Sequence, residues 1–542
     1  MTDLPANTQA GGGGMTPVAA RPESAEAEAR KVKAQGGDIQ SLTGVALWSI
    51  GLLLAFANFI ALLDTTITNV SVPNIAGGLA VSPSEGTWTI TSYSVAEAIT
   101  VPLTGWLAQR FGAVKVFCVA EILFGVFSFA CGFAPSLGVL IFFRICQGLS
   151  GGPMIPLSQT LLLRVFPPKD AASAMSLWGM TTVVAPIVGP LLGGILCDNV
   201  GWPWIFYINV PFALGAGYLS WRFLKAKETP GRKLPIDTGG MVLLVIWISA
   251  MQVMLDKGKE LDWFNSSFIR GCLVVAVVGF AAFMIWELTA KNPAVNLKVF
   301  RHRSFATACG VMAVAFACFF SLNVILPLWL QTNMNYTATW AGRTTAWSGV
   351  LAVVFSPIVG RLMGKIDARA MVMFGILGNA SIAFMRAGFA SNIDYWHIII
   401  PQILQGIFVP FFFIPLMSIG TANLPREEMA SGAGLISFVR TTAAAFGVSI
   451  ATTSWEDAGQ SERVNLLNQG AQYDPTISGL RAAGASLSKA AQQVEGIIQT
   501  QATMLATDRI YLITGLLMVI AASSIWLAPK PRFGGGPPAG GH

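Results

Sequence analysis

Five charged side chains lie inside long apolar stretches of the chain, namely Asp64, Glu97, Glu121, Arg144 and Arg440. A charge in hydrocarbon costs roughly 2.5–3.5 kcal/mol on insertion scales, so such residues persist where they have a partner or a function. Burial disfavours the charged form of a carboxylate, whereas a nearby arginine favours it. Asp64, Glu97 and Arg144 are therefore the smallest set that could bind and release a proton, and we predict proton coupling there.

The positions of the three acids leave different alternatives open. Asp64 lies near the end of its apolar stretch, where the membrane interface could instead keep it wet. Glu97 lies in the middle of a stretch, so a functional role is the favoured interpretation. Glu121 is expected to reach the interface by snorkelling rather than to take part in transport.

Three polar residues are candidates for substrate contact or gating: Arg440, Asn69 and Gln147. Arg440 either has such a role or forms a salt link to a loop group. Asn69 follows Asp64 by five residues, and Gln147 follows Arg144 by three.

The composition identifies the solvent of this chain as a bilayer. Hydrophobic residues make up 54% and charged residues 11%, with a mean hydropathy of +0.61, whereas soluble domains carry roughly 25% charged residues. A soluble fold could not bury that much apolar surface. The net charge of +7 is attributed to basic cytoplasmic loops rather than to nucleic-acid binding.

The remaining composition argues against a cofactor, a metal site or an enzyme. The seven cysteines form no CxxC pair and are interpreted as small buried hydrophobic residues, and the three histidines are scattered. No nucleophile–base set, phosphate loop or metal-ligand spacing is visible. The first 44 residues contain no apolar run, so no cleavable signal peptide is expected.

Runs of about 20 apolar residues predict an all-α polytopic membrane protein with fourteen transmembrane helices. The span at 238–255 is short for a helix that crosses the bilayer. The predicted spans are 45–69, 87–108, 114–134, 137–164, 171–197, 202–224, 238–255, 268–287, 304–331, 337–363, 370–390, 395–423, 430–454 and 508–528.

Loop charges predict the orientation of these helices. With the N-terminus inside, the short cytoplasmic loops carry seventeen Lys and Arg residues, and the short outer loops carry three, Lys257, Lys259 and Arg270. Because positive residues favour the cytoplasmic side, both termini are expected to be cytoplasmic.

An internal repeat organises the spans into two halves. Pro102-Leu-Thr-Gly105 returns as Pro357-Ile-Val-Gly360, and Gln147-Gly148 returns as Gln405-Gly406, at offsets of 255 and 258. A parallel repeat of this kind is typical of transporters built from two similar bundles. The predicted regions are a disordered tail (1–44), an N-terminal six-helix bundle (45–224), a linker with two inserted helices (225–303), a C-terminal six-helix bundle (304–528) and a disordered tail (529–542).

One long loop, residues 455–507, lies on the outer side in this topology. It is polar, and Leu480, Leu487, Val494, Ile498 and Leu505 recur at spacings of seven and four, as one apolar stripe of a helix. The stripe is either an extension of the last span resting on the protein or a docking surface for a periplasmic partner.

Two segments carry glycine and proline at spacings that suit conformational change. Pro186, Gly189, Pro190 and Gly193 lie in the fifth span, and proline costs about 3 kcal/mol inside a helix, so a bendable helix with a flat face is expected. In the loop after the second span, Gly105 and Gly112 permit a tight turn, and Arg110 and Lys115 are expected to form a latch at the cytoplasmic face. These eight residues form the two predicted conformational motifs.

These residues carry a family resemblance. Gly105 to Lys115 resembles the loop motif of the major facilitator superfamily, Arg144 to Gly148 its fourth-helix motif, and Ala185 to Gly194 its antiporter motif. Leu63 to Val70 and Trp204 to Pro211 are similar to motifs of the fourteen-span drug:proton antiporters within it, and more closely of the EmrB-type exporters. Gln109 departs from the loop motif, which usually has Asp there and thereby a stronger charge latch.

The resemblance implies a major facilitator fold and a proton-driven exporter of hydrophobic toxic compounds in the bacterial inner membrane. It also implies a periplasmic adaptor of the EmrA type and an outer-membrane channel as partners, with no cofactor beyond the proton gradient. Substrate is expected between the halves, near aromatic residues such as Phe56, Trp178, Phe319, Phe408 and Phe412. A dedicated exporter of a single metabolite or aromatic acid is the alternative.

Overall fold

The computed structural model describes residues 44–530 except 168–169, 230, 232–233, 391–392, 426, 469–473 and 484–485. Within these residues the chain is helical and contains no strand. The predicted disordered tails lie outside the described residues, apart from residue 44 and residues 529–530.

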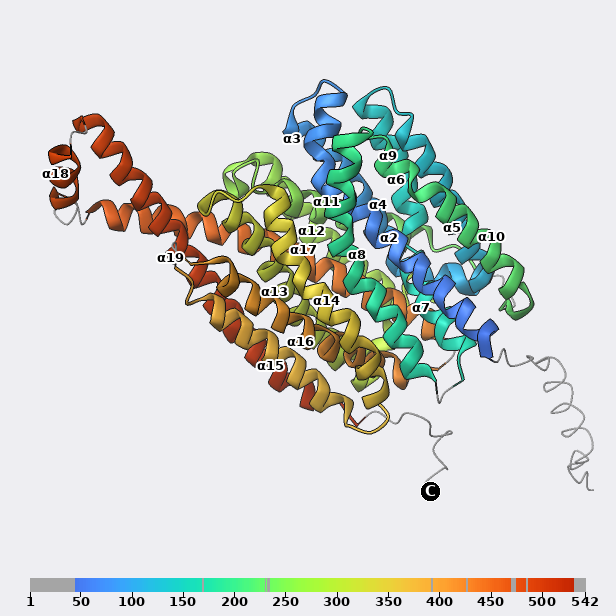
Figure 1. Ribbon diagram of the computed structural model, residues 1–542. Helices are drawn as coiled ribbons and strands as arrows, with labels where there is room; N and C mark the ends of the chain where they lie inside the picture. Colours follow the sequence, from blue (N-terminus) through green and yellow to red (C-terminus); the bar gives the residue numbers. More distant parts are fainter. Residues whose placement is uncertain are drawn as a thin grey trace, which may run out of the picture. The chain divides into compact units, whose positions relative to one another are not determined.

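The first half and the insert form a series of helices separated by short loops (Figure 1). They are α2 (Gly44–Gly78), α3 (Pro83–Gly86), α4 (Trp88–Phe111), α5 (Ala113–Gly132), α6 (Leu137–Gly151), α7 (Met154–Val165), α8 (Ala171–Asn199), α9 (Trp204–Tyr207), α10 (Asn209–Leu224), α11 (Thr238–Lys257) and α12 (Ser267–Thr289). Glycine and proline at 151–153 separate α6 from α7, so one predicted span is drawn as two helices.

The second half repeats the arrangement, and its last two long helices, α17 and α19, are longer than their counterparts α8 and α10. They are α13 (Arg303–Asn333), α14 (Ala338–Leu362), α15 (Ala368–Arg386), α16 (Tyr395–Ala422), α17 (Met429–Asn468), α18 (Asp474–Ala482) and α19 (Leu487–Ser524). Short 3-10 turns lie at Lys225–Lys227, Trp263–Asn265, Leu297–Arg301 and Ile525–Leu527.

The same helix pairs pack in each half. In the first half α2 packs on α8, α4 on α6, and α5 on α10; in the second half α13 packs on α17, α14 on α16, and α15 on α19. The halves meet along two seams, α4 against α17 and α8 against α14. The repeat in the sequence therefore corresponds to a repeat in helix packing.

Eleven helical segments of the described chain are long and apolar enough to cross a membrane. The helix α8 makes twelve if its two parts, which meet at a bend of 41°, form one span. The two remaining predicted spans coincide with α4, which carries many polar residues, and with the broken pair α9 and α10, whose longer member has 16 residues. Each predicted span is thus helical, two of them as broken pairs, and the count of fourteen crossings stays a prediction.

The two helices of the inserted pair have different surroundings. The helix α12 exposes the side chains of Val274, Val277 and Val278, as a lipid-facing helix does. In contrast, α11 packs on both α4 and α17. The Ser449 hydroxyl of α17 donates to the Leu255 carbonyl, and the Trp247 ring lies 5.9 Å from the Phe438 ring. The insert therefore covers the seam between α4 and α17.

The predicted outer loop is largely helical. The helix α17 continues to Asn468, and α19 begins at Leu487, so both extend beyond their predicted spans. Figure 1 shows α18 at the tip of this extension, next to α19. Leu480 belongs to α18, so the predicted stripe is broken between two helices. Within α19, Val494 and Ile498 are buried, whereas Leu487 and Leu505 are exposed.

Candidate functional site

The first half contains a buried ion pair between α2 and α6. Arg144 Nη1 lies 2.6 Å from Asp64 Oδ2, and the two side chains are 1% and 0% exposed. A buried charge pair is stable only where further hydrogen bonds satisfy its remaining polar atoms. The alternative in which the membrane interface keeps Asp64 wet is therefore wrong. The helix α2 continues to Gly78, and Asp64 is buried inside the bundle.

Amide groups from α6 and α10 complete the coordination of Asp64. Oδ1 accepts from Asn209 Nδ2 at 2.7 Å and from Gln147 Nε2 at 3.0 Å. The Asn209 amide is itself 3.4 Å from the Ser128 hydroxyl, which donates to the Phe206 carbonyl. Three helices, α2, α6 and α10, thus meet at one carboxylate, and α5 is linked to it through Ser128 and Asn209.

Arg144 keeps partners other than Asp64. Its Nη1 also donates to Gln147 Oε1 at 2.8 Å, and its Nε donates to the Thr89 carbonyl at 3.1 Å. The guanidinium carbon lies 4.2 Å from the Tyr93 ring centre, a favourable cation–π distance. Arg144 is therefore held by groups of α4 and α6 as well as by Asp64.

Glu97 and Arg440 are not part of the Asp64–Arg144 ion pair, although the charges of Asp64 and Arg144 act on Glu97. Glu97 is on α4 and Arg440 on α17, and their charges act on each other across the seam between the halves. No ion pair joins them within the described chain, and Arg440 Nη2 has no partner there. The two residues are thus placed to respond to a change in the separation of the halves.

The other predicted single residues differ in how deeply the structure buries them. Gln147 is buried in the Asp64 network, whereas Asn69 is exposed on α2. Glu121 is fully buried with neither carboxylate oxygen hydrogen-bonded in the described chain, so the predicted snorkelling is wrong. The reason is that Glu121 faces Gly217 of α10, which allows the two helices to approach closely.

The antiporter-like segment of α8 packs directly beside Asp64. A methyl group on Gly189 would collide with the Thr66 side chain, and one on Gly193 would meet Val70 and the Ile67 carbonyl. The prolines at 186 and 190 lie at the bend of α8. The flat glycine face therefore lets α8 contact the turn of α2 that follows Asp64.

The loop between α4 and α5 is held by the linker that precedes the insert. Arg110 donates to the carbonyl of Leu234, and Glu228 accepts from the backbone N–H of Val114 and Lys115. Gly112 has φ +96°, where other residues would be strained. The Lys115 side chain is exposed. The latch therefore uses backbone groups and Glu228, and Gln109 instead contacts the Glu427 carbonyl of the second half at 3.4 Å.

The two repeated glycines make equivalent contacts between the halves. A methyl on Gly105 of α4 would collide with Ser431 of α17, and one on Gly360 of α14 would collide with Ser176 of α8. The Ser176 hydroxyl donates to the Ser356 carbonyl. Both seams are thus closed at the end where α4 ends and α17 begins, which we call the basic end because Arg110, Lys115, Arg361 and Lys365 lie there.

Aromatic residues fill the region between the halves. The Trp178 ring of α8 is stacked on Phe413 of α16 at 5.9 Å, and Phe316 lies 5.5 Å from both Phe413 and Phe412. Phe319 contacts Phe412 at 5.8 Å. Phe56 and Phe408, also expected near substrate, contact Phe212 and Phe374 within their own halves.

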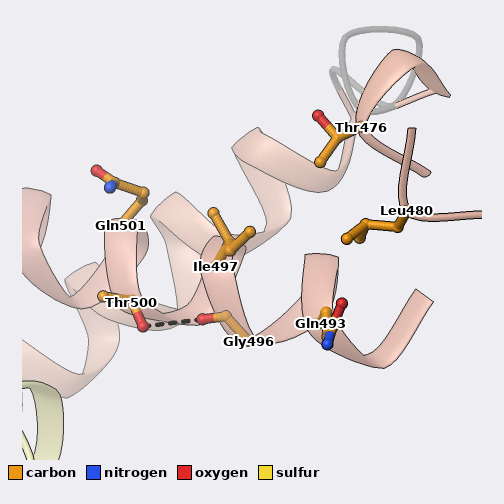
Figure 2. A pocket seen from close by; sticks show the side chains of 7 residues that line it. All are labelled: Thr476, Leu480, Gln493, Gly496, Ile497, Thr500 and Gln501. Carbon is orange, nitrogen blue, oxygen red and sulfur yellow. Dashed lines mark hydrogen bonds between the residues drawn. The ribbon is translucent and has the colours of Figure 1, made fainter. Parts of the chain in front are cut away.

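An open pocket of about 600 Å³ lies between α18 and α19 (Figure 2). In Figure 2 the Leu480 and Ile497 side chains face the space between the helices. Its lining residues are Thr476, Leu480, Gln493, Gly496, Ile497, Thr500 and Gln501. Among the residues that the structure describes, no group of three or more His, Cys, Asp or Glu side chains could hold a metal.

Sequence reasoning missed two buried polar residues. Asn209 was noticed only as part of a motif, and its contact with Asp64 requires the fold. Arg386 is fully buried on α15, inside the predicted span 370–390. The rule that charges in apolar spans need a reason would have identified it.

Comparisons with known proteins agree with the predicted class. The model of the family described as Major Facilitator Superfamily matches residues 54–448. The chain is 41% identical over 505 residues to the multidrug export protein EmrB of Escherichia coli K12, covering 92% of this chain and 98% of that protein. It is 39% identical to the fatty acid resistance protein FarB of Neisseria gonorrhoeae, covering 93% and 100%.

A solved structure confirms the fold. The proton:xylose symporter XylE superposes with a TM-score of 0.56 at 15% sequence identity, covering 89% of this chain and 96% of that one. The all-α, polytopic membrane architecture predicted from the apolar spans is thus confirmed, and at this identity the likeness concerns the fold alone.

Proposed function

Because the chain belongs to the major facilitator superfamily and to its EmrB-like exporters, we propose that it is a proton-coupled multidrug efflux transporter of the bacterial inner membrane. The Asp64–Arg144 ion pair is the single observation that carries the coupling. A hydrogen ion that binds Asp64 removes one charge of a buried pair. The protonated and ionised forms then favour different arrangements of α2, α6 and α10.

The coupling to conformation is proposed to run through α8 and the seams. Gly189 and Gly193 allow α8 to pack closely on the turn of α2 that follows Asp64, and α8 also forms one seam with α14. A shift of α2 therefore reaches the contact of Ser176 with Gly360. Glu97 and Arg440, which face each other across the other seam, are proposed to respond when substrate enters.

The substrates proposed are hydrophobic toxic compounds that bind among the aromatic residues between the halves. The rings of Trp178, Phe413 and Phe316 offer apolar, stackable surfaces rather than a fixed set of polar contacts, which suits a range of compounds. The second candidate is a dedicated exporter of one amphiphilic acid, and the relative named for fatty acid resistance favours it.

Orientation and partners are proposed from charge and shape. The basic end is assigned to the cytoplasm, with both termini there, because positive loops favour that side. The paired extension of α17, α18 and α19 would then project into the periplasm. We propose that its pocket and the exposed Leu487, Ile497 and Leu505 receive an adaptor of the EmrA type, which leads to an outer-membrane channel.

Transport by inside-out vesicles tests the proposal. A proton gradient should drive uptake of a hydrophobic fluorescent dye, and an uncoupler should stop it. Asp64→Asn should abolish gradient-driven uptake while leaving dye binding measurable. Uptake that persists with the uncoupler, or in Asp64→Asn together with Glu97→Gln, would contradict proton coupling at these residues.

Replacing Leu487 and Ile497 with Ser tests the adaptor separately. Vesicle transport should be retained and cellular drug resistance lost, because only export across the whole envelope needs the adaptor. Unchanged resistance would refute docking at this extension. Loss of vesicle transport would instead assign these residues to the transporter itself.

A further inference from the structure

The second half contains a buried arginine that the proposed function does not use. Arg386, the last residue of α15, is 0% exposed. Its Nη2 donates to Gln405 Oε1 of α16 at 2.7 Å, whereas Nε and Nη1 have no partner among the described residues. A buried guanidinium without a negative partner is strongly destabilising, so its two free donor groups require an acceptor.

Other buried donors around Arg386 also lack acceptors. They include Gln405 Nε2, the side-chain amide of Gln402 one turn earlier on α16, and the hydroxyl of Tyr511 on α19. The Tyr511 ring centre lies 6.0 Å from the Arg386 guanidinium carbon. Gln402 and Gln405 are 1% and 0% exposed. An amide can present either its oxygen or its nitrogen, so Gln402 can also serve as a donor here.

The repeat explains which chemical group these donors would receive. Gln405 is the repeat equivalent of Gln147. In the first half, Gln147 accepts from Arg144 through Oε1 and donates through Nε2 to the Asp64 carboxylate. In the second half, Gln405 accepts from Arg386 through Oε1, and its Nε2 has no acceptor in the described chain. An arginine–glutamine contact therefore recurs in the second half without a carboxylate, although Arg386 lies on α15 and the position equivalent to Arg144 is Gln402.

The chain itself does not supply that negative charge. The helix α13, which corresponds to α2, contains no Asp or Glu, and neither do α14, α15 and α16. Asp508 lies three residues before Tyr511 on α19, and it forms no ion pair with Arg386 within the described residues. Within the described residues, one positive charge and several N–H and O–H donors thus lie together without an ion-paired carboxylate, although the charge of Asp508 acts on Tyr511.

We infer that Arg386, Gln405, Gln402 and Tyr511 bind a small monovalent anion inside the second half. Its negative charge takes the place that the Asp64 carboxylate has in the first half. The chemistry fits chloride and equally the carboxylate of a small organic acid, because both accept hydrogen bonds from a guanidinium and from amides. The inference does not depend on transport or on the direction of transport.

Thermal unfolding of the purified full-length protein tests the site. The protein is prepared in gluconate, a carboxylate whose many hydroxyl groups oppose burial, and chloride or hexanoate is then added at constant ionic strength. A ligand that binds only the folded state raises Tm, and a rise of about 2 °C or more is expected at 150 mM. A response to chloride indicates an inorganic ion, and a response to hexanoate alone indicates a carboxylate ligand; both support the site.

Two variants and a control connect the response to Arg386. Gln405→Glu places a carboxylate beside Arg386, so Tm in gluconate should rise and the anion response should disappear. Arg386→Met should also remove the response. Arg343→Gln changes an exposed arginine of α14 and should keep it. If Arg386→Met does not fold, Gln405→Glu still decides the question.

Two results would overturn the inference. The first is an equal Tm in gluconate, chloride and hexanoate for the unmodified protein. The second is an anion response in Gln405→Glu as large as that of the unmodified protein.

Discussion

Asn209→Leu is the substitution that probes the Asp64 site most selectively. The Asn209 amide donates to the Asp64 carboxylate at 2.7 Å and is fully buried, and leucine has a similar volume without a donor. The ion pair with Arg144 and the bond from Gln147 remain. The substitution thus removes one group that stabilises ionised Asp64 and leaves the rest of its coordination.

The size of the effect follows from the strength of that bond. A hydrogen bond to a charged group contributes about 1.5–3 kcal/mol, and a tenfold change in proton binding corresponds to about 1.4 kcal/mol. Because the ionised form loses this stabilisation, the pH at which gradient-driven transport is half-maximal should move upward by about 1 to 2 pH units.

The assay is dye transport by inside-out vesicles, measured as a function of pH under a constant gradient. Asn199→Leu is the matched control, because that exposed amide donates only to the Ile195 carbonyl of its own helix. The control should keep the pH profile of the unmodified protein. If Asn209→Leu lowers the rate without moving the profile, Asn209 has only a structural role and the reasoning fails.

Three further predictions concern the seams and the loops. Gly105→Val should reduce transport more than tenfold, because the valine side chain would collide with Ser431. Gly342→Val is the control: a side chain there meets nothing within 4 Å, and transport should be retained. Equal transport rates of the two variants in vesicles would contradict the close contact of α4 with α17. Lys257→Met should lower the free energy of unfolding by about 1–3 kcal/mol, since the buried ammonium contacts Ser84, Thr87 and Glu260. Lys259→Met, which breaks an exposed pair with Glu456, should lower the free energy of unfolding by less than about 1 kcal/mol. If denaturant unfolding shows that Lys259→Met destabilises the protein more than Lys257→Met does, the proposed contact of α11 with α4 through Lys257 is refuted. Hydrogen bonds from Arg369 lower the pKa of Asp367, so its contribution to stability is present above the ordinary aspartate value of about 3.9 and is lost as the pH falls through the lowered pKa. The Tm of Asp367→Asn should therefore be lower than that of the unmodified protein at pH 7 and converge with it near pH 3, and a constant difference at all pH values would exclude this ion pair.

The sequence predicted most of the fold because the bilayer imposes a simple length rule on apolar helices. Each predicted span became a helix, and the repeat of Gly105 and Gly360 became a pair of equivalent contacts. The ends were less predictable. Polar, alanine-rich and glutamine-rich segments can continue a helix into water, so α17 extends fourteen residues beyond the predicted end at 454.

The site was predictable in its charges and not in its coordination. The cost of a buried charge identified Asp64 and Arg144, which the structure brings together. The same cost led to the wrong position for Glu121, because spacing alone does not show that Gly217 leaves room for it inside the bundle. Asn209 is 145 residues from Asp64, and the Leu234 carbonyl that holds Arg110 is a backbone group, so neither contact has a signature in residue type.

The most direct test of proton binding at Asp64 is substrate-induced proton release from the purified protein in weakly buffered detergent solution. Addition of a transported dye to the unmodified protein should release protons, which a pH indicator detects. Asp64→Asn should bind the dye and release none. Equal proton release from Asp64→Asn and from the unmodified protein would contradict the proposed role of the Asp64–Arg144 pair.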